Sequence, residues 1–244
     1  MVPEEDKTMR KIVMDLVENS GFIKSQEEFN KFSKIVPSLL KKGIDNLNLS
    51  MFSPELKNNI LVALGEGYRK KGNLHEAAKS FLLAENKAKL NSVGEDYERL
   101  LQYDNCIEIY KTSGNTKKLF EIGRRCLVEG KFKQAAKAFV EVNYQEGLKQ
   151  VGDACIENCK FDQAFEVLSI IKDKQMLIIL GDKCIEEKNY AYAMNAYQLA
   201  DSKERLNQVG DLLLKDEHIH QAMEAYALAN NEEMVAFIRD NFAE

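Results

Sequence analysis

The chain has 244 residues, of which 45% are hydrophobic, and it carries 34 Lys and Arg residues against 39 Asp and Glu residues, for a net charge of −5. Its apolar runs are far shorter than the roughly 20 residues of a membrane-spanning helix, and its acidic, polar start lacks the composition of a signal peptide, so we expect no membrane insertion. The net negative charge argues against nucleic acid as the main partner. Five cysteines without an obvious pairing pattern indicate a reducing, cytoplasmic location.

Two helical patterns occupy residues 1–52. The first places its apolar residues on one face and ends at a glycine: Met9, Ile12, Val13, Leu16, Val17 and Gly21. The second begins at Ser25 and is bent or ended by Pro37. We expect residues 1–52 to form an N-terminal helical cap.

From Ser53, which caps a helix whose first residue is Pro54, the sequence repeats with a period of 29 residues up to residue 231. Six glycines mark this period: Gly65, Gly94, Gly123, Gly152, Gly181 and Gly210. A leucine stands four residues before each glycine, and a large apolar, a small and a second large apolar residue follow it by nine, twelve and sixteen residues. These offsets predict six hairpins, each of two antiparallel helices of about 12 residues, stacked as a solenoid.

The recurring glycine has a predicted packing role. Because it has no side chain, the second helix of each hairpin can approach the first helix closely at this point, which offsets the conformational cost of glycine in a helix.

Turn chemistry supports the hairpins. Gly72 and Gly130 stand where first helices should end. Asn143, Asp201 and Asn230 each precede a first helix and have a glutamate three residues later, which predicts capping boxes at these three residues.

The second hairpin allows two interpretations. Only Asp104 and Asn105 resemble a turn between Glu95 and Thr112, so the segment could be one long helix that ends at Gly114. The repeat columns favour a diverged hairpin instead.

The columns resemble those of the tetratricopeptide repeat. In one hairpin the matching residues are Leu177, Leu180, Gly181, Cys184, Ala193, Tyr197 and Ala200. The period of 29 rather than 34 residues and the missing closing proline depart from that family, and short units of this kind look like those of coatomer and intraflagellar-transport subunits. The resemblance implies an all-α, alpha–alpha superhelix in which the first helices line a concave, partner-binding groove.

Residues 232–244 continue the repeat without completing it. Val235, Ile238 and Phe242 fall in apolar columns, but Arg239 replaces the glycine. Since no second helix follows, we expect a solvating C-terminal capping helix.

Charge divides the chain. Residues 1–52 are balanced, residues 53–140 have 16 basic against 11 acidic residues, and residues 141–244 have 10 against 20. On the first helices, the resemblance implies basic groove residues at the front and acidic ones at the back, beside an apolar row: Arg69, Lys70, Arg99, Lys117 and Arg124, then Asp153, Asp182 and Asp211, with Leu127, Ile156, Ile185 and Leu214. The row is either part of the core or an apolar groove that takes a basic amphipathic segment.

Catalytic, cofactor and metal motifs are absent from the sequence. Cys126, Cys155 and Cys184 share one column and are expected to be small core residues, and His218 and His220 to be turn residues. We therefore predict a non-enzymatic protein-interaction scaffold without cofactor or metal. The alternatives are a structural subunit of a larger assembly and, from another class, nucleic-acid binding through the basic front half. The charge division also suggests weak head-to-tail self-association.

Overall fold

The computed structural model describes residues 36–242, and these residues form helices and turns with no β-strand. The chain is all-α and belongs to the alpha–alpha superhelix class. The two helices predicted before residue 36 lie outside the described residues. Pro37 lies within α3 (Val36–Lys42), which continues for five residues beyond it.

The chain divides into two compact units, Met1–Asn115 and Thr116–Glu244. In unit 1, α3 and the short 3-10 helix η1 (Ile44–Asn46) precede two hairpins, α4 (Pro54–Lys70) with α5 (Leu74–Leu83) and α6 (Lys87–Arg99) with α7 (Tyr103–Ser113). Helix α3 packs on α4 at Gly67, where an added Cβ would lie 2.9 Å from Val36. The Ser53 hydroxyl caps α4, as predicted, by accepting a hydrogen bond from the Leu56 amide.

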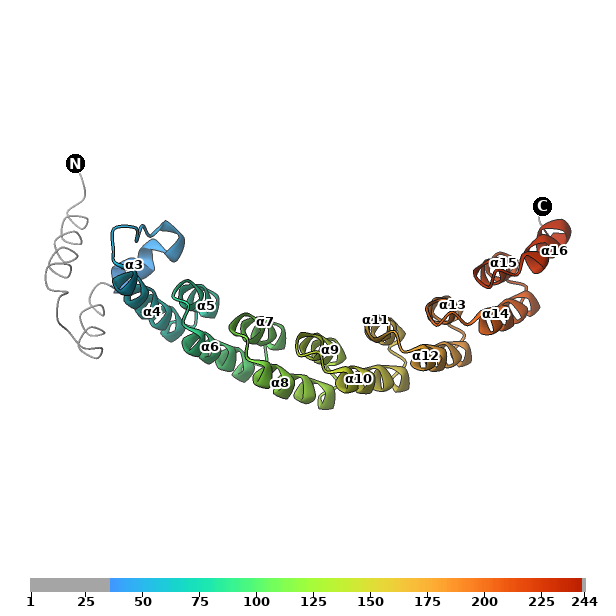
Figure 1. Ribbon diagram of the computed structural model, residues 1–244, viewed down its shortest axis with the longest axis horizontal. Coiled ribbons are helices and arrows are strands. Elements are labelled where there is room, and N and C mark those ends of the chain that lie inside the picture. Colours follow the sequence, from blue (N-terminus) through green and yellow to red (C-terminus); the bar gives the residue numbers. More distant parts are fainter. Residues whose placement is uncertain (1–35, 243–244) are drawn as a thin grey trace. The chain divides into compact units, whose positions relative to one another are not determined.

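Unit 2 holds four hairpins and one further helix. The hairpins are α8 (Thr116–Val128) with α9 (Phe132–Glu141), α10 (Gln145–Glu157) with α11 (Phe161–Ile171), α12 (Lys174–Glu186) with α13 (Tyr190–Leu199) and α14 (Lys203–Lys215) with α15 (Ile219–Leu228). Helix α16 (Glu232–Phe242) follows and packs on α15. Within unit 2 the first helices of the hairpins form one layer and the second helices form the other (Figure 1).

The segment with two sequence interpretations is a hairpin. Helix α6 ends at Arg99 and α7 begins at Tyr103, so the turn comprises Leu100 to Gln102 rather than Asp104 and Asn105. Leu101 has a positive φ of 56° and supplies the reversal that a glycine would supply more easily. The sequence did not indicate a turn at these residues because leucine is rarely found in turns.

Each turn from α4 to α16 contains one residue with positive φ, and most of these are not glycine. At the turn after α9, Asn143 has φ 52°, and the next amide, of Tyr144, donates to the Phe139 carbonyl at 2.9 Å, which is the pattern of a Schellman motif. The capping boxes predicted at Asn143, Asp201 and Asn230 are therefore wrong. These residues end the preceding helix in the left-handed conformation, and the N-cap position falls one residue later.

The recurring glycines lie where the two helices of a hairpin meet. A Cβ added to Gly181 would lie 2.4 Å from the Tyr197 ring, and Gly65, Gly94, Gly123 and Gly210 face the equivalent aromatic ring at 2.4–2.7 Å. Gly152 instead faces Leu168 at 2.8 Å. The predicted close approach of the second helix at each glycine is confirmed.

In unit 2, a residue of a first helix also contacts the residue 24 positions later, at the start of the next first helix. The same column forms an aromatic pair, an ion pair or an amide hydrogen bond in different repeats, and the last pair joins α14 to the start of α16. The pairs are Phe120 with Tyr144 (ring centroids 5.0 Å apart, edge-on), Lys149 with Asp173 (2.8 Å) and Asn207 with Asn231 (2.7 Å).

Candidate functional site

The apolar row lies on the four first helices of unit 2. Leu127 is on α8, Ile156 on α10, Ile185 on α12 and Leu214 on α14, each four residues after the recurring glycine. Ile156 is 7% exposed and belongs to the core, whereas the other three are half-buried. The row therefore combines packing with partly exposed apolar surface.

Two of the three acidic residues beside the row have partners inside their own hairpin. The Tyr197 hydroxyl donates to Asp182 Oδ1 at 2.6 Å, and the Tyr226 hydroxyl donates to Asp211 Oδ1 at 2.6 Å. Arg205 of the next hairpin also donates to Asp182 Oδ2 at 3.2 Å. Asp182 and Asp211 thus fix the aromatic side chains that pack on the glycines.

These contacts raise the pKa of both tyrosine hydroxyls. Burial raises the pKa of the Tyr197 hydroxyl well above its usual value, and the hydrogen bond to Asp182 raises it further. The pKa of Tyr226 rises for the same two reasons, with Asp211 as the partner. Both hydroxyls remain protonated donors, as the carboxylates require.

Asp153 differs from the other two acidic residues. Its hairpin has Leu168 where the others have tyrosine, and the next hairpin has Met176 where Arg205 stands. Among the described residues, no side chain donates a hydrogen bond to Asp153 or forms an ion pair with it. Partial desolvation raises the pKa of its carboxyl, Glu157 and Glu146 on the same helix raise it further, and Lys149 acts in the opposite direction. Asp153 is exposed, so its carboxylate is accessible to an external cation.

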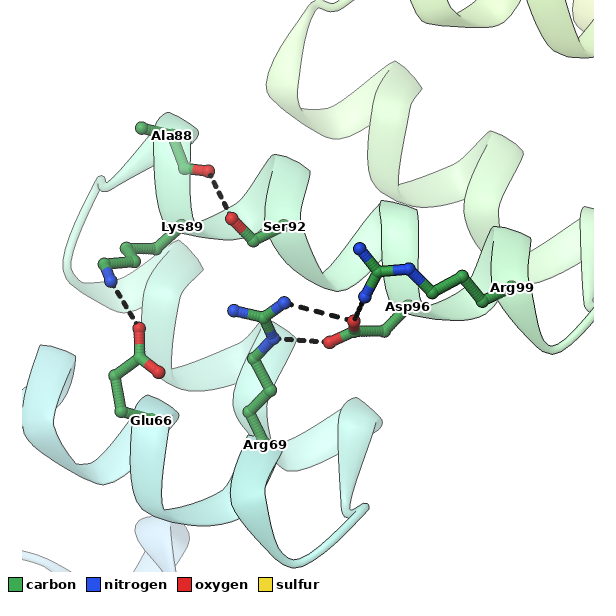
Figure 2. Close-up of polar contacts among 7 residues, drawn as sticks. All are labelled: Glu66, Arg69, Ala88, Lys89, Ser92, Asp96 and Arg99. Atoms are coloured by element: carbon green, nitrogen blue, oxygen red, sulfur yellow. Dashed lines mark hydrogen bonds and ion pairs between the residues drawn. The ribbon is translucent and has the colours of Figure 1, made fainter.

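In unit 1, two predicted groove residues are held by an aspartate that the sequence analysis did not select. Arg69 on α4 forms a two-bond ion pair with Asp96 on α6, one bond being Nη2 to Oδ1 at 3.1 Å, and Arg99 also donates to Asp96 Oδ1 at 2.9 Å (Figure 2). The paired arrangement raises the pKa of Arg69, with the hydrogen bond to Asp96 as the largest cause. The charges of Arg69 and Arg99 are therefore paired with Asp96 inside unit 1, and Asp96 could have been found only by pairing columns of adjacent repeats.

The remaining basic candidates are exposed. Lys70 lies at the end of α4, Lys117 in the first turn of α8 and Arg124 in the middle of α8. The Arg124 guanidinium lies 6.0 Å from the centroid of the Phe120 ring. Arg124 occupies the column that holds Asp153, Asp182 and Asp211 in the next three hairpins. The charge of this column, which lies beside the apolar row, therefore changes from positive on α8 to negative on α10.

The shared-column cysteines belong to the core, as predicted. Cys126, Cys155 and Cys184 are fully buried, and burial raises the pKa of Cys155 to about 11 and that of Cys184 to about 12. In the described part of the chain, no group of three His, Cys, Asp or Glu side chains is placed to hold a metal ion.

Two open cavities lie between the turns of consecutive hairpins. One, of 410 Å³, is lined by residues that include His75, Tyr97 and Gln102 in unit 1. The other, of 640 Å³, is lined in unit 2 by residues that include Tyr190 and Asp216, whose side chains are hydrogen-bonded at 3.0 Å. Neither contains a set of residues with a recognisable catalytic arrangement.

Comparisons with known proteins show no family. No family model matches the chain, and no curated protein matches it. A solved structure described as a circular tandem repeat protein with novel repeat topology and enhanced subunit contact surfaces is similar at 14% identity, with 87% of this chain and 49% of that chain covered and a TM-score of 0.14. The chain thus spans about half the length of that protein. At this TM-score the likeness carries no argument, and the fold rests on the helices and packing described above.

None of the helices in the described range 36–242 combines the length and apolar character needed to cross a membrane.

Proposed function

We propose that this chain is a non-enzymatic scaffold of the tetratricopeptide-like kind, and that the first helices of unit 2 bind a basic, amphipathic protein segment. The observation that carries the proposal is the apolar row, in which Leu127, Ile185 and Leu214 are half-buried, beside an acidic column in which, among the described residues, no side chain forms a hydrogen bond or an ion pair with Asp153. In tetratricopeptide-like solenoids this face of the first helices lines the concave groove, whereas in unit 2 of this chain the second helices lie on the inner side of the curve (Figure 1), so the row is proposed as a binding surface on the outer side. The row would contact the apolar side of the segment, and Asp153 would accept its Lys or Arg.

Charge supports the choice of a basic partner. Three exposed acidic residues share one side of α10: Glu146, Asp153 and Glu157. Their spacings are close to two turns and one turn of the helix, so their side chains lie on the same side. Desolvation raises the pKa of Asp153 most, repulsion by Glu157 and Glu146 raises it further, and a bound cation would relieve this repulsion. Arg124 and Lys117 at the start of unit 2 favour an acidic residue at the opposite end of the segment.

The compartment we propose is the cytoplasm. All five cysteines are free thiols, and the four buried ones need no oxidising environment. A structural role in a larger assembly would use the same row as a permanent interface, and nucleic-acid binding would use the lysines of α8 and α9 instead.

The test uses a labelled peptide with Leu and Lys at helical spacing, the same peptide with Glu in place of Lys, and a single-stranded RNA oligonucleotide. Fluorescence anisotropy with the full chain should show preferential binding of the basic peptide. Asp153→Lys should weaken this binding by about tenfold, which is the size of one well-placed charge contact. Glu166→Lys, an equal charge change at an exposed site on α11, is the matched control and should leave affinity nearly unchanged.

Two results would reject the proposal. Equal losses for Asp153→Lys and Glu166→Lys would mean that only net charge matters. Tighter binding of RNA than of the basic peptide, with a steep loss of affinity as salt rises, would assign the chain to nucleic-acid binding. Sedimentation at low and high salt, run alongside, tests the head-to-tail self-association suggested by the charge division.

A further inference from the structure

An ion pair joins consecutive first helices in the same register in both units. The acidic residue directly after the recurring glycine pairs with a basic residue 23 positions later, which is the third residue of the next first helix. The pairs are Glu66 with Lys89 in unit 1 (Figure 2) and Asp182 with Arg205, at 3.2 Å, in unit 2. The repeat therefore brings these two columns within reach of each other.

Between α8 and α10 the same two columns form no ion pair among the described residues. Arg124 stands 23 positions before Gly147. A Cβ added to Gly147 would overlap the Tyr144 ring and lie 2.8 Å from the Phe139 ring, so aromatic packing occupies the space that a side chain would need. The Arg124 guanidinium is exposed and lies 6.0 Å from the centroid of the Phe120 ring.

Between α10 and α12 the pair is missing for a similar reason. Asp153 stands 23 positions before Met176, which is 8% exposed. The terminal methyl group of Met176 lies 3.2 Å from a Cβ added to Gly152, in the hairpin where Leu168 replaces the aromatic residue. Both positions that could neutralise a charge are thus used for packing, and exposed opposite charges remain on α8 and α10.

These two charges are spaced for a single helix. Helices α8 and α10 are consecutive first helices in contact, and the axes of packed helices lie about 8–10 Å apart. Residues seven positions apart on a helix lie on one side, about 10 Å apart along its axis. Farther along the row, Asp182 is paired with Arg205 and Asp211 accepts a hydrogen bond from Tyr226, so α8 and α10 hold the charges that are open to a partner.

We propose that the segment bound on the first helices of unit 2 carries an acidic residue opposite Arg124 and, seven positions away, a basic residue opposite Asp153. This inference rests on the proposed function and adds the charge pattern of the partner. The segment supplies the two charges that Gly147 and Met176 do not supply. Arginine forms strong paired contacts with a carboxylate, and a like charge at either position is repelled, so the two residues select the partner.

The experiment uses three labelled amphipathic peptides that differ only at two positions seven residues apart, which hold Glu and Lys, two Lys or two Glu. In fluorescence anisotropy the unchanged full chain should bind the Glu–Lys peptide about tenfold more tightly than either of the others. Arg124→Glu should make the Lys–Lys peptide the tightest ligand, and Asp153→Lys the Glu–Glu peptide. Lys133→Glu, an equal charge change at an exposed residue of α9, is the matched control and should keep the preference for Glu–Lys.

Two results would overturn the inference alone. The unchanged chain could bind the Lys–Lys peptide at least as tightly as the Glu–Lys peptide, or Arg124→Glu and Lys133→Glu could change the preference equally. Either result leaves the proposed function in place, since a basic amphipathic segment still binds. Failure of all three peptides to bind would reject the proposed function and this inference with it.

Discussion

The residue that follows each recurring glycine differs in role from hairpin to hairpin. Asp182 and Asp211 accept hydrogen bonds from Tyr197 and Tyr226, and so serve the packing of their hairpins. Asp153, in the same column, belongs to a hairpin that has Leu168 in place of the tyrosine, and its carboxylate is accessible. One column of the repeat therefore contains both structural acids and a candidate binding acid.

Replacing Asp153 tests whether its charge is unfavourable to folding. Because burial and the neighbouring glutamates raise the pKa of this carboxyl in the folded state, ionisation destabilises the fold at neutral pH. Asp153→Asn should raise the melting temperature at neutral pH. This gain should shrink as pH falls through the raised pKa and vanish below the unfolded-state pKa of about 4. An equal gain at acid and neutral pH would show that charge is not the cause.

The close approach at the glycines predicts a graded response to alanine. Gly181→Ala places a methyl group 2.4 Å from the Tyr197 ring and should destabilise the chain by about 1–3 kcal/mol in urea unfolding. Gly152→Ala meets the flexible end of Leu168 at 2.8 Å and is the matched control with a smaller loss. Similar losses for both would mean that the aromatic ring does not limit the approach.

At the residue scale, the sequence predicts columns better than contacts. The close approach of helices at the glycines and the burial of the cysteines were predicted because the same kind of residue recurs every 29 positions. The pair of Asp182 with Tyr197 and the pair of Arg69 with Asp96 were not predicted, since their members lie in different columns and occur in only some hairpins.

The turns explain how 29 residues suffice for a hairpin. Each turn is short and centres on one left-handed residue, and in most of them a Schellman hydrogen bond such as that of Tyr144 to Phe139 closes the turn, whereas the turn after α11 has a bond from the Lys172 amide to the Leu168 carbonyl instead. From α4 to α16 the helix pattern predicted the elements correctly, including both helices of the second hairpin. The positions of the caps were wrong by one residue, because Asn and Asp favour both helix starts and left-handed helix ends.

A left-handed leucine predicts a stabilising substitution. Leu101 has φ 56° and is 63% exposed, so Leu101→Gly removes backbone strain without loss of core packing. The expected gain is about 0.5–1 kcal/mol of unfolding free energy, part of the strain being offset by the greater freedom of glycine in the unfolded chain. Leu100→Gly is the control. Leu100 has φ −83°, and a gain there as well would show that the effect is not conformational.

The ion pair between Lys149 on α10 and Asp173 before α12 is predicted to be sensitive to acid. The hydrogen bond from Lys149 lowers the pKa of Asp173, and the amides of Met176 and Gln175 at the start of α12 lower it further. Ionised Asp173 therefore adds stability above its unfolded-state pKa, and this is lost as pH falls through the lower folded-state pKa.

Asp173→Asn retains an N-cap side chain but removes the ion pair with Lys149. It should lower the melting temperature slightly at neutral pH and have no effect in acid. A loss that persists in acid would indicate that the cap, and not the charge, was altered.

At the scale of the whole molecule, the binding surface that we propose lies on the first helices of unit 2. The apolar row and the three aspartates all lie there, whereas Arg69 and Arg99 of unit 1 are held by Asp96. The division of the chain into a cap over 1–52, hairpins over 53–231 and a terminal helix over 232–244 stays a prediction. Binding surfaces were harder to predict than the fold because exposure depends on neighbouring hairpins, as the burial of Ile156 beside its half-buried counterparts shows.

Hydrogen–deuterium exchange of the full chain with and without the basic amphipathic peptide would show whether the first helices of unit 2 form the binding surface. We expect slower exchange in α10, α12 and α14, with little change in α11, α13 and α15, because the segment lies along the first helices. Slower exchange confined to the second helices, or to the lysine-rich surface of α8 and α9, would contradict this expectation.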